Sequence, residues 1–106
     1  MKARFVYDGK AIDYTPTEDT PAGSVVMIGD IVGITKLDIA ANTLGALHLV
    51  GVYDIEKASG AIDMGTIVYW DSTAQNVTTT NTNNSFLGVV IKDAAASDST
   101  IRVRIG

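Results

Sequence analysis

The stretch Thr100–Ile105, which reads TIRVRI, decides the fold class. Its β-branched apolar residues alternate with polar ones, and a period of two residues is the pattern of a half-buried β-strand. Such a strand places its apolar side chains on one face of a sheet and its two arginines on the other. The stretch therefore predicts a strand that covers a hydrophobic core.

Toward the N-terminus, short apolar segments of the same character recur between turn residues. The predicted strands cover residues 25–28, 31–34, 66–70, 75–80 and 86–92, with a longer apolar stretch at 44–54. The segment 56–65 is the only helix candidate, and its glycines limit it to one turn. Short strands at regular spacing predict an all-β fold, which is a small β-barrel or a jelly-roll-like sandwich with little or no helix.

The first 20 residues predict an arm or a hairpin. Asp8-Gly9 is a strong turn signal, because a type I′ turn needs residues that tolerate positive φ, and apolar residues flank it. Residues 15–23 contain Pro16 and Pro21, which exclude regular structure and predict an extended loop. We expect residues 1–106 to form a single domain, with 1–20 as its arm or hairpin.

Composition argues against several classes of protein. The chain has no cysteine, so a disulfide framework and a thiolate metal site are excluded. The net charge of −4 opposes binding to a phosphate backbone, so nucleic acid is not an expected partner. No apolar run approaches the roughly 20 residues that cross a bilayer, and the N-terminus lacks a signal-peptide pattern. We therefore expect no membrane partner and synthesis in a cytoplasm.

No catalytic, cofactor-binding or metal-ligating residue is predicted. The single histidine, His48, lies in an apolar strand, where the ring is expected to pack or to make one hydrogen bond. The carboxylates Asp8, Asp30, Asp71 and Asp98 fall at turns, where aspartate bonds the local backbone. The chain is therefore not expected to be an enzyme.

Certain residues are instead candidates for contacts with other proteins. They are Tyr69, Trp70, Arg102, Arg104, Arg4, Pro16 and Pro21. Tyr69 and Trp70 face opposite sides of one strand, so one belongs to the core and the other lies nearer the surface. Arg102 and Arg104 share a strand face, which Arg4 joins if the terminal strands pair. The alternative for the aromatic residues is core packing, and for the arginines a solvated face.

Several motifs follow one another in a characteristic order. They are Pro21-Ala22-Gly23, residues 25–34, Gly51-Val52-Tyr53, Lys57-Ala58, Gly65, residues 68–71, residues 77–80, residues 87–90 and residues 100–105. This order resembles the phage capsid decoration (cement) proteins, a family long labelled "predicted recombinase, phage-associated". The recombinase label would require a nucleotide-binding strand–loop–helix unit. Residues 29–36 have neither its glycine spacing nor a following helix.

The resemblance implies a structural protein of the phage head, encoded by a phage or prophage and made in the bacterial host cytoplasm. It would lie on the capsid exterior of the virion, bind assembled major capsid protein, and stabilise the shell without catalysis. It would act as a homodimer or homotrimer, with the N-terminal arm and the loop 15–23 reaching the capsid. The alternative is a virion-displayed module that binds carbohydrate or the host surface through Trp70, Tyr69 and the Asn-rich loop 81–85.

Overall fold

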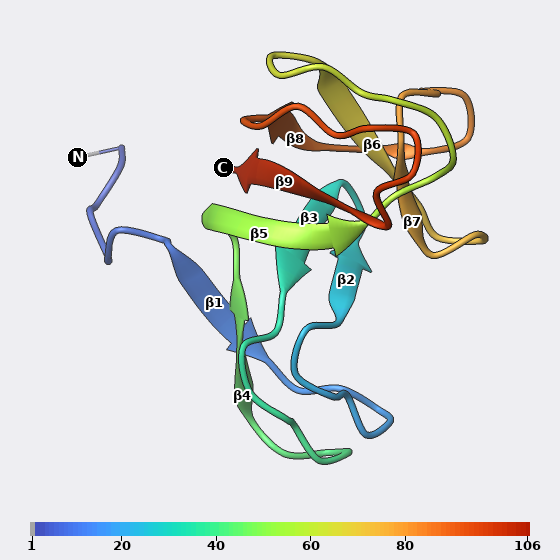
Figure 1. Ribbon diagram of the computed structural model, residues 1–106. Coiled ribbons are helices and arrows are strands. Elements are labelled where there is room, and N and C mark those ends of the chain that lie inside the picture. Colours follow the sequence, from blue (N-terminus) through green and yellow to red (C-terminus); the bar gives the residue numbers. More distant parts are fainter. Residues whose placement is uncertain (1) are drawn as a thin grey trace. The chain divides into compact units, whose positions relative to one another are not determined.

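The computed structural model describes residues 2–106, and these contain nine β-strands and no helix (Figure 1). The strands are β1 (Ala11–Tyr14), β2 (Val25–Ile28), β3 (Ile31–Ile34), β4 (Gly45–His48), β5 (Gly51–Glu56), β6 (Ile67–Asp71), β7 (Asn76–Thr78), β8 (Ser85–Val90) and β9 (Thr100–Ile105). Most are rich in β-branched and aromatic residues, which favour extended backbone. The all-β prediction is confirmed.

The strands form two antiparallel sheets, which fits the jelly-roll-like sandwich and not the barrel. One sheet has the order β1-β4-β3-β2, and the other has the order β5-β9-β8-β6-β7. Contacts divide the chain into a first unit, residues 2–26 with 33–49, and a second unit, residues 27–32 with 50–106. Neither sheet of the described residues closes into a barrel, and the single domain stays a prediction.

The first unit is built on the pairing of β1 with β4, from Ala11 opposite His48 to Tyr14 opposite Gly45. Its small core contains Ile34, Ile39 and Leu47, of which Leu47 is fully buried. Leu47 lies against Gly33 of β3, where a Cβ atom would overlap the leucine side chain. The leucine therefore fills the space that the glycine leaves.

The N-terminal hairpin is not formed in the described structure. Residues 2–9 contain no strand, and the segment predicted as its second strand pairs with β4 as β1. An isolated two-stranded hairpin is marginally stable in water, whereas β4 offers β1 a place in a four-stranded sheet. Gly9 still has a positive φ of 76°, as its turn signal predicts.

The loop 15–23 is extended, as predicted, but it is tied to the segment 35–42. Thr20 and Ile39 exchange both backbone hydrogen bonds at 2.8 Å. The buried Thr35 hydroxyl donates to the Pro21 carbonyl at 2.8 Å and accepts from the Ser24 amide at 3.0 Å. These bonds fix the loop onto the rest of the first unit, so it is not a free arm.

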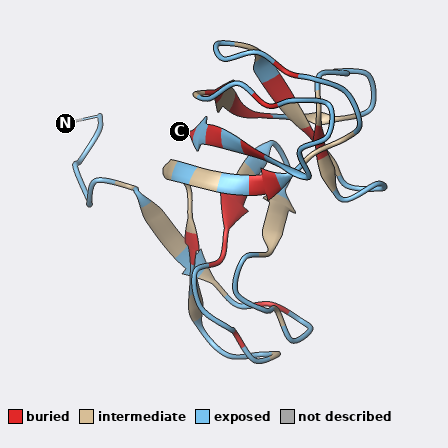
Figure 2. Ribbon diagram, in the orientation of Figure 1, coloured by how far each residue is buried: buried red, intermediate tan, exposed pale blue. Residues whose placement is uncertain are grey.

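The second unit buries one face of its five-stranded sheet. Along β9, Ile101, Val103 and Ile105 are buried and the residues between them are exposed, as the alternation predicts (Figure 2). Further core side chains are Ile55, Ile62, Val68, Trp70, Val77, Leu87, Val90 and Ala94. At Gly88 of β8 a Cβ would overlap the carbonyl oxygen of Arg104, so β8 and β9 approach closely only because this residue is glycine.

Two irregularities shape this sheet. Val68 pairs with Gly88 but Tyr69 pairs with Phe86, so Leu87 is an extra residue of β8 and forms a β-bulge. Because the bulge interrupts the alternation of the strand, the neighbouring residues Leu87 and Gly88 are both buried. In addition, Lys57 forms a parallel bridge to Val77, with the Ala58 amide donating to the Val77 carbonyl at 2.8 Å. The bridge joins the end of β5 to β7, the two outermost strands of the order.

Candidate functional site

The uncovered face of the five-stranded sheet carries a row of side chains that crosses four strands. Val52 of β5 pairs with Arg104 of β9, Arg104 pairs with Val89 of β8, and Val89 pairs with Ile67 of β6. Val52 and Ile67 are each 51% exposed, although both are large and aliphatic. The register therefore assembles an apolar row from four strands with one arginine within it.

Two aromatic rings extend this row. Tyr69 of β6 lies opposite Phe86 of β8, with ring centroids 6.4 Å apart at an interplanar angle of 77°. This edge-to-face geometry is favourable for aromatic pairs. Phe86 remains 57% exposed. We call Val52, Ile67, Tyr69, Phe86, Val89 and Arg104 the exposed sheet face.

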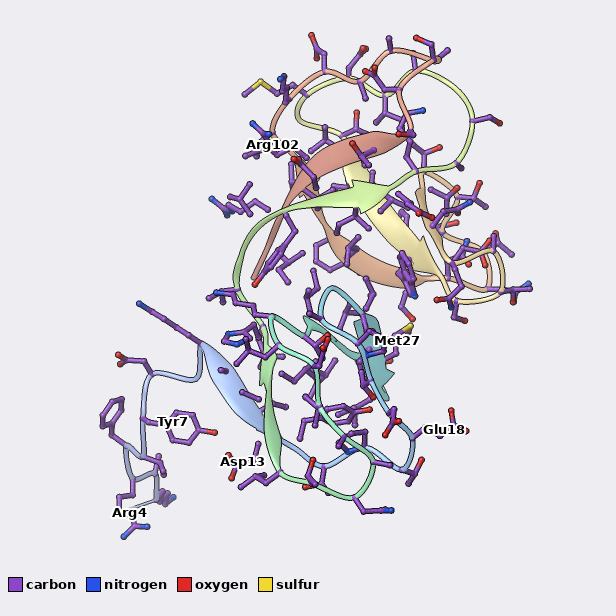
Figure 3. All side chains as sticks on the ribbon, turned by 60° about the horizontal axis from the view of Figure 1, so that its bottom comes forward. Arg4, Tyr7, Asp13, Glu18, Met27 and Arg102 are labelled. Carbon is purple, nitrogen blue, oxygen red and sulfur yellow. The ribbon has the colours of Figure 1, made fainter. Side chains whose placement is uncertain are left out.

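A charged pair lies beside the exposed sheet face. Arg102 Nε donates to Asp54 Oδ1 at 2.9 Å and its second guanidinium nitrogen donates to Oδ2 at 3.1 Å (Figure 3 labels Arg102). This hydrogen bonding lowers the pKa of Asp54, to which the charges of Arg102 and Lys92 also contribute. Both partners are exposed, so the pair contributes little to stability. Arg104 makes no ion pair among residues 2–106, which leaves its charge available.

The structure separates the residues that the sequence suggested as contacts. Tyr69, Arg102 and Arg104 lie together on the uncovered side of the second unit. Trp70 is only 5% exposed and Pro16 is buried, so both support the fold and neither offers a contact surface. The prediction of one core and one outer aromatic residue is thereby confirmed.

The remaining two candidates lie in the first unit. Arg4 is exposed in residues 2–9. Pro21 is exposed in the loop 15–23, which we call the tied loop. Arg4 does not join Arg102 through paired terminal strands, because β1 pairs with β4 and β9 pairs with β5 and β8. The condition for a shared arginine patch is therefore not met.

Residues 2–9, which we call the N-terminal arm, form a second uncovered surface. Phe5, Val6 and Tyr7 are 78%, 69% and 57% exposed, and no hydrogen bond joins the arm to the rest of the described chain. Figure 3 labels Arg4 and Tyr7 of the arm. The arm contains Lys2, Arg4 and one carboxylate, Asp8, for a net charge of +1, which leaves −5 on the rest of a chain whose total is −4. Sequence reasoning assigned the apolar triplet to a hairpin and missed its exposure.

The described residues offer no evident metal site. No group of three or more His, Asp or Glu side chains lies close enough to hold a metal ion within residues 2–106. Asp71 accepts hydrogen bonds from the Thr73 and Ala74 amides, and Asp98 accepts one from the Ala95 amide, as expected of turn aspartates. His48 is half-buried on β4. In the same part of the chain, no helix has the length and apolarity to cross a membrane.

Comparison with known proteins identifies a family. The sequence pattern of a family described as "phage cement protein" matches residues 6–105, which is nearly the whole chain. Neither the curated proteins nor the solved structures gave a match. The family match covers both units and residues 6–9 of the N-terminal arm.

Proposed function

The chain belongs to the phage cement protein family, and we propose that it binds the outer surface of the assembled capsid and stabilises the shell. Its partner in this role is the major capsid protein, and the role involves no chemical step. The observation that carries the proposal is the exposed sheet face. Aromatic residues and arginine are enriched where protein interfaces gain most of their binding energy, and this face combines two rings with Arg104.

The proposed mechanism is mechanical. A shell repeats the same surface many times, so each copy of the protein meets an equivalent docking position. When one oligomer occupies several docking positions on the shell at once, its individually weak contacts combine into a higher overall affinity. Self-association as a dimer or trimer provides that oligomer, because closed symmetry is the common form of small oligomers.

The alternative role, a carbohydrate- or host-surface-binding module, loses its main support. That hypothesis used Trp70 and Tyr69 as a platform on which a sugar ring stacks. Trp70 is 5% exposed, so its ring is not available for stacking. The exposed aromatic partner of Tyr69 is Phe86, which lacks a hydrogen-bonding group for a sugar hydroxyl.

The test is co-sedimentation of the purified protein with phage heads assembled without it. We expect saturable binding to expanded heads and none to unexpanded proheads, together with a higher temperature of head disruption. Failure to bind expanded heads would refute the proposed function. An unchanged disruption temperature with full occupancy would refute the stabilising role.

A matched pair of variants tests the exposed sheet face. The double variant Ile67→Ser, Phe86→Ser removes apolar contact area, and both side chains are more than half exposed, so folding should be retained. We expect at least roughly tenfold weaker binding, the effect of about 1.4 kcal/mol at an interface. Met64→Ser is the control, because Met64 is 65% exposed and lies outside this face. Equal binding by both variants would exclude this face as the capsid contact.

A further inference from the structure

The first unit carries a second uncovered feature that is complementary to its own N-terminal arm. A pocket of about 350 Å³ lies between the tied loop and the segment that follows β3. It is lined by Asp19, Thr20, Pro21, Asp38, Ile39 and Ala40. We call it the acidic pocket, because two carboxylates border a mainly apolar depression.

The two carboxylates are held in place by the backbone. Oδ1 of Asp19 accepts a hydrogen bond from the Ala41 amide at 2.9 Å, and Oδ1 of Asp38 accepts one from the Ala22 amide at 2.7 Å. The second oxygen of each has no hydrogen bond from the described residues. Both carboxylates are exposed, so each presents one fixed acceptor oxygen to an incoming cation.

The N-terminal arm has the chemistry that such a pocket binds. Arg4 is followed directly by Phe5, so a guanidinium and an aromatic ring are offered side by side. Arginine pairs with carboxylates through geometrically matched hydrogen bonds, and an aromatic ring fills an apolar depression. The arm is positive in a chain that is otherwise acidic, so electrostatic attraction favours this encounter.

The arm points away from the pocket of its own chain. It precedes β1, whereas the tied loop follows the other end of β1, and Arg4 and Tyr7 lie far from Glu18 of that loop (Figures 1 and 3). An extended arm of this length spans roughly 26 Å at about 3.3 Å per residue. That reach is sufficient to cross to a neighbouring molecule.

We infer that the N-terminal arm of one copy docks in the acidic pocket of a second copy of this chain. Arg4 pairs with the carboxylates of Asp19 and Asp38, and Phe5 packs against Pro21 and Ala40, the exposed apolar residues of the lining. Because each copy has both an arm and a pocket, the exchange repeats from copy to copy, and it ends in a closed oligomer where the rotation between copies closes a ring. The inference rests on the proposed self-association and does not depend on capsid binding.

A disulfide-trapping experiment tests the contact directly, since the described chain and its full sequence contain no cysteine. Two single-cysteine proteins, Phe5→Cys and Ala40→Cys, are mixed under mild oxidation and separated on a non-reducing gel. We expect a covalent heterodimer in preference to homodimers. Met64→Cys replaces Ala40→Cys as the control, because Met64 is exposed in the second unit and should not trap the arm.

Association in solution provides the second test. Removing residues 2–9 deletes no described strand, so the shortened protein should fold and sediment as a monomer while the full chain forms an oligomer. The variant Asp19→Asn, Asp38→Asn keeps an oxygen for each backbone amide but removes the charges. We expect about tenfold weaker association, consistent with the loss of charged hydrogen bonds. Thr17→Asn is its control, since Thr17 is an exposed residue of the same loop that does not line the pocket.

The outcomes separate this inference from the proposed function. An oligomer that survives removal of the arm, or trapping no stronger than with Met64→Cys, would overturn the arm exchange but leave capsid binding intact. A full chain that is monomeric at all concentrations, yet needs its arm to bind heads, would assign the arm to the capsid and also overturn the exchange. Loss of head binding by variants that still oligomerise would affect only the proposed function.

Discussion

The second unit holds 11 of the 14 buried apolar side chains of the described residues, whereas the first unit holds only Ile34, Ile39 and Leu47. The first unit compensates with side-chain-to-backbone hydrogen bonds from Thr35, Asp19 and Asp38, which join segments up to 22 residues apart. The first unit, which has a small core, is thus stabilised by specific hydrogen bonds, and the second unit, which has a larger core, is stabilised by packing. The two should respond differently to substitution.

The largest effect is expected from Trp70→Ala in the second unit. Trp70 is 5% exposed, and truncating a buried aromatic side chain costs roughly 3–5 kcal/mol in unfolding free energy. Urea denaturation measures this loss, and Trp70→Phe should recover much of it. A stable Trp70→Ala protein with impaired head binding would show instead that Trp70 is a contact residue.

The next effect compares one glycine from each unit. Gly88→Ala directs a methyl group at the Arg104 carbonyl, part of the β8–β9 ladder, and should cost about 3 kcal/mol. At Gly33→Ala the nearest atoms belong to the Leu47 side chain, which can change rotamer at lower cost. Denaturation midpoints of the two variants give the comparison. A larger loss for Gly33→Ala would mean that the first unit is the more rigidly packed of the two.

A smaller effect is expected from Thr35→Val in the first unit. The Thr35 hydroxyl is buried and bonds both Pro21 and Ser24, and unsatisfied buried partners cost about 2 kcal/mol. Thr35→Ser, which keeps the hydroxyl, is the control. Amide hydrogen exchange should quicken at Thr20 and Ile39 and stay unchanged along β9. Equal acceleration in both units would contradict their separate modes of stabilisation.

The smallest effect is expected from Asp54→Asn. Since Arg102 lowers the pKa of Asp54, the pair stabilises the fold above the ordinary aspartate pKa of about 4, and this contribution is lost as pH falls through the lowered pKa. Because the pair is exposed, the unfolding midpoint at neutral pH should change no more than in the control Asp63→Asn. A loss at neutral pH as large as that from Thr35→Val would contradict this assignment.

Local patterns predicted most of the second unit. The alternation in β9 and the apolar runs that became β6 and β8 are signals carried by adjacent residues. The apolar stretch 44–54 was harder, because it divides into β4 of the first unit and β5 of the second. Gly51, with a φ of 130°, begins β5, and no periodicity marks that division.

The exposed sheet face was predicted only in part. Tyr69 and Arg104 were candidates because their own residue types suggest contacts. Val52, Ile67 and Phe86 were missed, because an exposed apolar residue becomes part of a surface only through the register of distant strands. The side-chain hydrogen bonds of the first unit were missed for the same reason, because they join residues far apart in the sequence. Asp38 and Ala22, for example, are 16 residues apart.

The bridge between Lys57 and Val77 has a consequence for the proposed role, in which many copies lie on one shell. Unpaired outer strands on crowded neighbours can stack into continuous fibrous sheets. Here the Ala58 amide, just after β5, satisfies the Val77 carbonyl of β7, and the Lys57 ammonium donates hydrogen bonds to the Ala58 and Gly60 carbonyls of the adjoining loop. The second unit can therefore be packed at high local density with less tendency to polymerise through its backbone.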